Sequence, residues 1–219
     1  MGERKDDIKR SCIDCGYANC NKQDRKFPDF CTTTHLDGQV MEEALACYEE
    51  EDVKRLTVAA AEVESEHYCQ YNRVEEIVAF AKKLGAKKIG IATCVGLLSE
   101  SRTLAKIFRS HGFEVAGIGC KAGTVQKVEV GIPKKCENTG INMCNPIFQA
   151  KMLNKEKTDL NVLVGLCVGH DSLFYKYSDA YVTTAVTKDR VLAHNPAAAL
   201  YTCASYYGKM MGDAGAEKQ

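Results

Sequence analysis

Apolar positions repeat at helical spacing in the first third of the chain and predict three helices there. One covers residues 40–47, a second covers residues 52–67, and a third begins at Asn72. Glu75 follows Asn72 at the spacing of a capping box, in which each of the two side chains bonds the other residue's backbone N–H. Residues 11–36 lack apolar periodicity. The sequence therefore predicts an irregular loop followed by a helical module.

From Lys87 onward the pattern changes to strands that alternate with helices. Four runs are strongly apolar: residues 88–93, 114–119, 161–166 and 180–188. Helices are predicted at residues 98–110, after Asn145-Pro146 and after Asn195-Pro196. Strands that are apolar almost throughout and are joined by helices predict a parallel sheet covered on both faces.

The predicted fold class is therefore α/β. It contains a Rossmann-like, mostly parallel sheet flanked by helices, and a cysteine-rich loop and helical N-terminal module precede it. We expect the module to cover residues 1–71 and the Rossmann-like domain residues 72–211. A polar tail, residues 212–219, would end the chain.

The composition and net charge of the chain limit the kinds of partner that the sequence predicts. The chain has 219 residues, of which 45% are hydrophobic and 26% charged, as in ordinary globular proteins. Its 29 basic and 29 acidic residues give zero net charge, so no basic excess predicts nucleic acid or an anionic membrane as partner. No window approaches the roughly 18 apolar residues of a membrane span. The charged N-terminal stretch does not resemble a signal peptide, and we expect a cytoplasmic protein.

The chain contains twelve cysteines. In a reducing cytosol so many cysteines point to metal binding or redox chemistry and not to disulfides. Four of them, Cys12, Cys15, Cys20 and Cys31, lie together near the N-terminus. Four thiolates suit either tetrahedral zinc or an iron–sulfur cluster. A zinc ribbon usually has two C-x2-C pairs, and only Cys12 and Cys15 form one. The uneven spacing favours a 4Fe–4S cluster, with zinc as the alternative.

A second group of cysteines follows the predicted strands. Cys94, Cys120 and Cys167 each end an apolar run, Cys144 precedes the Asn145-Pro146 helix start, and Cys136 lies in the same loop. Ligands of open α/β sheets bind beyond the carboxyl ends of the strands. These five cysteines therefore predict a second metal or cluster site. The alternative is that they are small hydrophobic residues at the ends of buried strands.

Two other polar residues are expected at the same edge. His170 follows Cys167 and Lys121 follows Cys120, so both are candidate catalytic or substrate-binding residues there. Lys121 and His194 could also bind an anionic ligand. Cys47, Cys69 and Cys203 are expected to serve packing. No G-x-G-x-x-G follows the first strand, so a dinucleotide is not predicted.

Several segments carry a resemblance to a known family. CIDCGYANC, GIATCVGLLSES, GIGCK, CNPIFQA, VGLCVGHDSLF and VLAHNP resemble the cysteine-rich proteins of domain-of-unknown-function family 1847. The resemblance covers nearly the whole chain and implies metal binding, but it supplies no reaction. The strand-end cysteines are also similar in layout to the Rossmann-like domains of carbon monoxide dehydrogenases and hybrid-cluster proteins, which hold an iron–sulfur cluster that way. That likeness is architectural only.

The leading hypothesis is an iron–sulfur protein with a redox or redox-linked enzymatic role and one or two 4Fe–4S clusters. It would exchange electrons with a redox partner protein or a small-molecule substrate. The rival is a non-enzymatic zinc-binding module with a structural N-terminal site. A third hypothesis is thiol chemistry, with Cys144 or Cys167 as nucleophile and His170 as base.

Overall fold

The computed structural model describes residues 9–212 and divides the chain into two compact units. The division falls between Val58 and Ala59, inside helix α2 (Glu51–His67), whereas the sequence places a boundary after residue 71. Apart from Gly212, the predicted polar tail lies outside the described residues. Each unit is described by itself.

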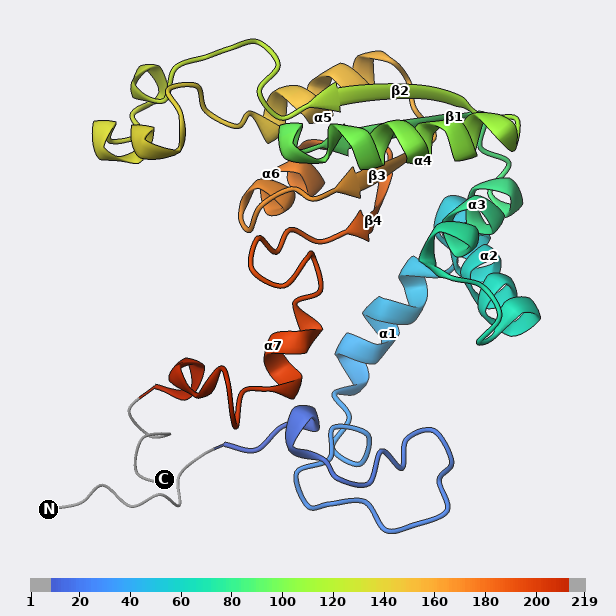
Figure 1. The fold of residues 1–219 in the computed structure, drawn as a ribbon. Helices are drawn as coiled ribbons and strands as arrows, with labels where there is room; N and C mark the ends of the chain where they lie inside the picture. Colours follow the sequence, from blue (N-terminus) through green and yellow to red (C-terminus); the bar gives the residue numbers. More distant parts are fainter. Residues whose placement is uncertain (1–8, 213–219) are drawn as a thin grey trace, which may run out of the picture. The chain divides into compact units, whose positions relative to one another are not determined.

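The first unit holds the cysteine-rich loop and helix α1 (Gly38–Cys47) (Figure 1). The only regular structure in the described part of the loop is a short 3₁₀ turn, η1 (Cys12–Asp14). Helix α1 begins after Asp37, whose side chain accepts from the backbone N–H groups of Gln39 and Val40. The predicted irregular loop followed by a helix is therefore present.

The second unit is an α/β domain. Its strands are β1 (Lys88–Thr93), β2 (Glu114–Gly119), β3 (Leu160–Val164) and β4 (Tyr181–Val186). Its helices beyond α2 are α3 (Arg73–Lys83), α4 (Leu98–Ser110), α5 (Pro146–Lys155), α6 (His170–Tyr177) and α7 (Ala197–Tyr201). The sheet order is β2-β1-β3-β4, and all its pairings are parallel. The predicted Rossmann-like α/β fold is confirmed.

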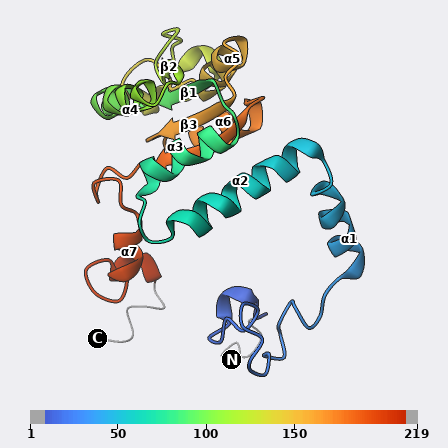
Figure 2. The same ribbon diagram turned by 90° about the vertical axis from the view of Figure 1, so that its right-hand side faces the viewer.

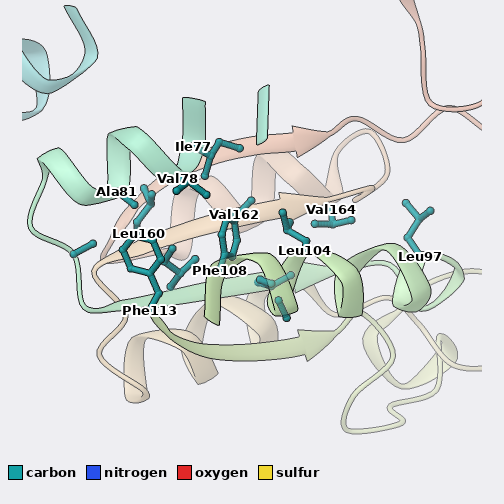
Figure 3. Close-up of a cluster of buried hydrophobic side chains, with 14 residues drawn as sticks. Ile77, Val78, Ala81, Leu97, Leu104, Phe108, Phe113, Leu160, Val162 and Val164 are labelled. Atoms are coloured by element: carbon teal, nitrogen blue, oxygen red, sulfur yellow. The ribbon is translucent and has the colours of Figure 1, made fainter. Parts of the chain in front are cut away.

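Helices cover both faces of this sheet (Figures 1 and 2). Helices α3 and α4 pack on one face through side chains such as Ile77 and Phe108, which share a buried cluster with Val162 of the central strand β3 (Figure 3). The other face packs against α5 and α6, where Phe174 is fully buried. Strands β1 and β3 are almost completely buried because they are central and covered twice.

Two predicted helix starts are confirmed in atomic detail. Asn72 and Glu75 form the reciprocal capping box at the start of α3. Asn145 accepts from the N–H of Phe148 at the start of α5, with Pro146 as the first helical residue. The second of these starts matters for function, because it fixes the backbone next to Cys144.

Helix α6 was not predicted. The sequence predicts no helix between the apolar runs at residues 161–166 and 180–188, whereas the structure has α6 there with His170 as its first residue. The helix has only eight residues, and its single fully buried side chain is Phe174. One buried position is too little to produce a helical apolar stripe. The correction places His170 at a defined helix start.

Candidate functional site at the sheet mouth

Three cysteines lie where three neighbouring parallel strands end, and we call this edge the sheet mouth. Cys94 directly follows β1, Cys120 directly follows β2, and Cys167 lies three residues beyond the end of β3. Thr93 at the end of β1 pairs in register with Gly119 of β2 and with Val164 of β3. The strand ends are therefore level, and the sequence-predicted gathering at one edge is present for these three residues.

Cys144 joins Cys120 at the sheet mouth. The backbone N–H of Asn145 donates to the carbonyl of Cys120 at 2.8 Å, which holds the two segments side by side. The two side chains lie close enough to change each other's pKa. Cys120 is buried, and Cys94 and Cys144 pack against the apolar cluster that contains it.

The two thiols of this pair differ in acidity. The hydrogen bond from Cys120, and then one from His170, lower the pKa of the Cys144 thiol to about 4, with the charge of Lys121 contributing. The hydrogen bond to Cys144, followed by burial, raises the pKa of Cys120 far above its ordinary value. Cys144 is therefore the thiolate of the pair and Cys120 its proton-bearing donor.

The ends of β1 and β2 are tied together around Cys94 and Cys120. The backbone N–H of Val95 donates to the Sγ of Cys120 at 3.4 Å. The buried amide of Gln149 donates to the carbonyls of Thr93 and Ile118, each close to a strand-end cysteine. These bonds fix the backbone from which Cys94 and Cys120 project.

Cys167 lies at the start of α6. Its carbonyl accepts from the backbone N–H of His170 at 2.9 Å and from that of Asp171 at 3.1 Å. The side chain of His170 reaches Cys144, so it connects the end of β3 with the start of α5. The predicted placement of His170 beside the cysteines is present.

Two cations at the sheet mouth were missed by the sequence analysis. The Nζ of Lys188 lies 3.5 Å from the Sγ of Cys94, and an Nη2 of Arg190 donates to the Sγ of Cys167 at 2.9 Å. Both follow β4, the fourth parallel strand. The rule that revealed the cysteines, that strand ends share an edge, could have revealed them too.

The remaining predicted residues have other partners. The Nζ of Lys121 donates to the backbone carbonyl of Asn142 while remaining close enough to act on the charge of Cys144. The Nδ1 of His194 accepts from the backbone N–H of Asp189, so this nitrogen is used within a turn. Cys136 lies in the 3₁₀ segment η4 (Lys134–Thr139), and its carbonyl accepts from Lys127. No hydrogen bond in the described chain joins Cys136 to another cysteine.

The N-terminal loop brings two of its four predicted ligands into neighbouring segments. The Sγ of Cys12 lies 3.2 Å from the Oγ1 of Thr32, which follows Cys31 in the sequence. The N–H of Cys15 donates to the carbonyl of Cys12. Desolvation raises the pKa of the Cys31 thiol, but hydrogen bonds from Thr33 and Thr34 outweigh it, and the net result is a lowered pKa.

Cys20 lies in a turn that the side chain of Asn19 closes. The buried side chain of Asn19 donates to the carbonyl of Arg25 and accepts from the N–H groups of Asp24 and Arg25. The thiols of Cys12 and Cys20 are exposed. Between residues 9 and 212, no three His, Cys, Asp or Glu side chains converge tightly enough to hold one metal ion.

The packing prediction for the other cysteines is wrong in two cases. Cys47 and Cys69 are exposed, and only Cys203 is half-buried. Cys47 ends α1, where its thiol reaches the carbonyl of Glu43, and Cys69 has a positive φ of 58° in the turn after α2. The spacing of Cys47 along its predicted helix did not indicate which face is covered, and Cys69 lies outside the predicted helices.

Comparison with known proteins places the chain in a family. The family described as Protein of unknown function (DUF1847) matches residues 31–185, about seven-tenths of the chain. The chain belongs to this family. DUF1847 proteins thus share the region that holds Cys94, Cys120, Cys136, Cys144 and Cys167, while the first three N-terminal cysteines precede it.

A curated relative supports membership of DUF1847. An uncharacterised protein of Methanocaldococcus jannaschii, MJ0455, is 46% identical over 164 residues, which cover 75% of this chain and 83% of the relative. Neither comparison names a reaction. Within the described residues, no helix is long and apolar enough to cross a membrane.

Proposed function

We propose that this protein is an iron–sulfur redox protein whose sheet mouth holds one cluster through Cys94, Cys120, Cys144 and Cys167. One observation carries the proposal: each of these four sulfurs faces a hydrogen-bond donor. The donors are Lys188 for Cys94, Val95 N–H for Cys120, His170 for Cys144, and Arg190 for Cys167. Donors of this kind stabilise thiolate ligands and tune the potential of a bound cluster.

Four cysteine thiolates can hold either a tetrahedral zinc ion or a 4Fe–4S cluster. In a 4Fe–4S cluster each thiolate binds a different iron, so the four thiols can come from four separate segments, as they do here. A cluster at this site would supply one-electron transfer.

The residues around Cys144 support a substrate position beside the cluster ligands. His170 and Lys121 both act on Cys144, and both are half-buried. A histidine can move a proton, and a lysine can hold a negative group, next to a redox centre. We propose that His170 and Lys121 act in these two ways on a small-molecule substrate. The alternative is that the cluster exchanges electrons with a redox partner protein.

The N-terminal cysteines Cys12, Cys15, Cys20 and Cys31 would hold a second cluster for electron transfer. Two observations support metal binding there. Cys12 contacts Thr32, the residue after Cys31, and the pKa of the Cys31 thiol is lowered. The rival for this site is structural zinc, with the sheet-mouth thiols serving only packing.

Metal analysis of anaerobically purified protein tests the proposal. We expect broad absorbance near ~400 nm and about eight irons, with a similar amount of acid-labile sulfide, if both sites hold 4Fe–4S clusters. Colourless protein with stoichiometric zinc would refute it and favour the zinc-binding module.

The Cys120–Cys144 pair favours a second candidate function, thiol–disulfide exchange. The Cys144 thiolate would attack a low-molecular-weight disulfide and release one thiol. Cys120 would then attack the mixed disulfide, releasing the second thiol and leaving a Cys120–Cys144 disulfide. The adjacency of the two residues, fixed by the Asn145–Cys120 backbone hydrogen bond, supports this reaction. It predicts such a disulfide in metal-free protein treated with glutathione disulfide.

The pKa of Cys144 gives a pH prediction for the metal-free protein. Because its thiol is ionised well below neutral pH, iodoacetamide should alkylate Cys144 rapidly at pH 6, where ordinary thiols near pKa 9.0 are protonated. The rate at which iodoacetamide alkylates Cys144 should fall only as the pH drops towards 4. Peptide mass spectrometry would assign the modified residue.

His170→Ala provides the matched change for this experiment, because it removes one donor to Cys144 and should move the alkylation profile to higher pH. Equal profiles for the two proteins, or a Cys144 that reacts only in alkaline solution, would contradict the described pair.

A further inference from the structure

A single turn after β4 carries two cations to two different strand ends. Lys188 reaches the sulfur of Cys94, beyond β1, and Arg190 reaches the sulfur of Cys167, beyond β3. These strands are neighbours in the sheet, although the chain crosses from one side of β1 to the other between β2 and β3. The turn therefore lies at the topological switch point, where open α/β sheets bind ligands.

The turn is a built structure. Asp189, between the two cations, accepts from the N–H groups of Val191 and Leu192, both at 2.8 Å. Its own N–H donates to the Nδ1 of His194, and its carbonyl accepts from the His194 N–H. Four hydrogen bonds thus organise the residue that separates Lys188 and Arg190, and two of them are accepted by its carboxylate.

Lys188 lies over both neighbouring strand ends. A Cβ placed on Gly96, after β1, would lie 3.8 Å from its Nζ, and one on Gly165, after β3, would lie 3.7 Å from its Cδ. The loops after β1 and β3 therefore both lie within van der Waals distance of the lysine side chain. Gly165 has a positive φ of 66°, and a Cβ there would clash with Leu97 at 2.0 Å, so the loop after β3 requires a glycine.

No ion pair in the described part of the chain joins Lys188 or Arg190 to a carboxylate. The ion pairs there involve other basic residues, and the contacts of Lys188 and Arg190 are with sulfur. Lys188 is half-buried. A partly buried positive charge without an acidic partner stabilises negative charge nearby.

We infer that Lys188 and Arg190 are positioning residues that stabilise the negative charge of a sheet-mouth cluster and raise its reduction potential. The inference rests on the iron–sulfur function proposed above. Reduction adds one negative charge to a cluster that already carries four thiolates. Two cations at the ligand sulfurs favour the reduced form over the oxidised form, which makes the potential less negative.

Redox titration of the full-length, anaerobically purified protein tests this inference. The sheet-mouth signal in electron paramagnetic resonance is identified by its absence from a Cys94→Ala/Cys167→Ala variant. Lys188→Gln and Arg190→Gln should each shift its midpoint potential to more negative values, and the double variant should shift it further. Lys87→Gln is the control, because Lys87 is exposed and precedes β1 at the opposite end of the sheet.

The outcomes separate the two claims. Absence of iron from the parent sheet mouth refutes the proposed function and with it the inference. A cluster whose potential is equal in all variants refutes the inference alone. If the Gln variants lose their iron, the charge-conserving variants Lys188→Arg and Arg190→Lys are measured next. Iron retained at the parent potential in these two variants supports the role of positive charge. Loss of iron from these two variants too overturns the inference.

Discussion

Replacing Cys94 and Cys167 together by Ala is expected to reduce the bound iron from about eight to about four per chain, because a 4Fe–4S cluster needs four cysteine ligands. The two residues come from different strand ends and face different cations, so their loss removes half of the proposed ligands. Iron and sulfide analysis of anaerobically purified protein measures the effect. The N-terminal cluster should remain.

A Cys47→Ala/Cys203→Ala variant is the matched control, since it also removes two thiols but neither belongs to the sheet mouth. Its iron content should equal that of the parent. An unchanged metal content in the Cys94/Cys167 variant, with only modest destabilisation, would show that these thiols serve packing, as the zinc-module rival requires.

Phe108→Ala is expected to lower the free energy of unfolding by about 3–5 kcal/mol. Phe108 is fully buried between α4 and the sheet, and its ring meets that of Phe113 edge to face with centroids 6.4 Å apart (Figure 3). Removing the ring leaves a cavity that the rigid β1–β3 layer cannot fill. Urea unfolding of metal-free protein, followed by far-ultraviolet circular dichroism, measures the change.

Phe148→Ala provides the comparison for this prediction. Phe148 lies in the first turn of α5 and is 36% exposed, so the same substitution should cost about 1 kcal/mol or less there. Equal losses in the two variants would contradict the assignment of the core to the face covered by α3 and α4.

The fold was largely predictable because its strongest signals are local. The apolar runs of β1 and β3 stand out since both strands are buried on two faces, and the caps at Asn72 and Asn145 mark helix starts through their own side chains. Helix α6 was missed for the opposite reason. It buries only Phe174 completely, and its position depends on packing against α5 that no local pattern records.

The site was predictable as far as strand ends determine it. Cys94, Cys120 and Cys167 meet because parallel strands end at one edge, and Cys144 joins them through the start of α5. Cys136 follows no such rule, because it lies inside a long excursion between β2 and α5 (Figure 1). A position within a loop gives no information about which way the loop turns.

The cations were missed for a chemical reason. The sequence pattern indicates soft metal ligands, and these are cysteines. The proximity of Lys188 and Arg190 to cysteine sulfurs is visible only in the structure. Charged residues after a strand are common on protein surfaces. Lys188 and Arg190 are distinguished from such surface charges by their contacts with the sulfurs of Cys94 and Cys167.

The central claim is that the sheet mouth holds an iron–sulfur cluster by itself, and one variant tests it most directly. In the full chain, Cys12, Cys15, Cys20 and Cys31 are all replaced by Ser, and iron, sulfide and zinc are measured after anaerobic purification. We predict about four irons and about four sulfides per chain, held by the remaining sheet-mouth thiols. A folded protein that contains neither iron nor sulfide would contradict the claim.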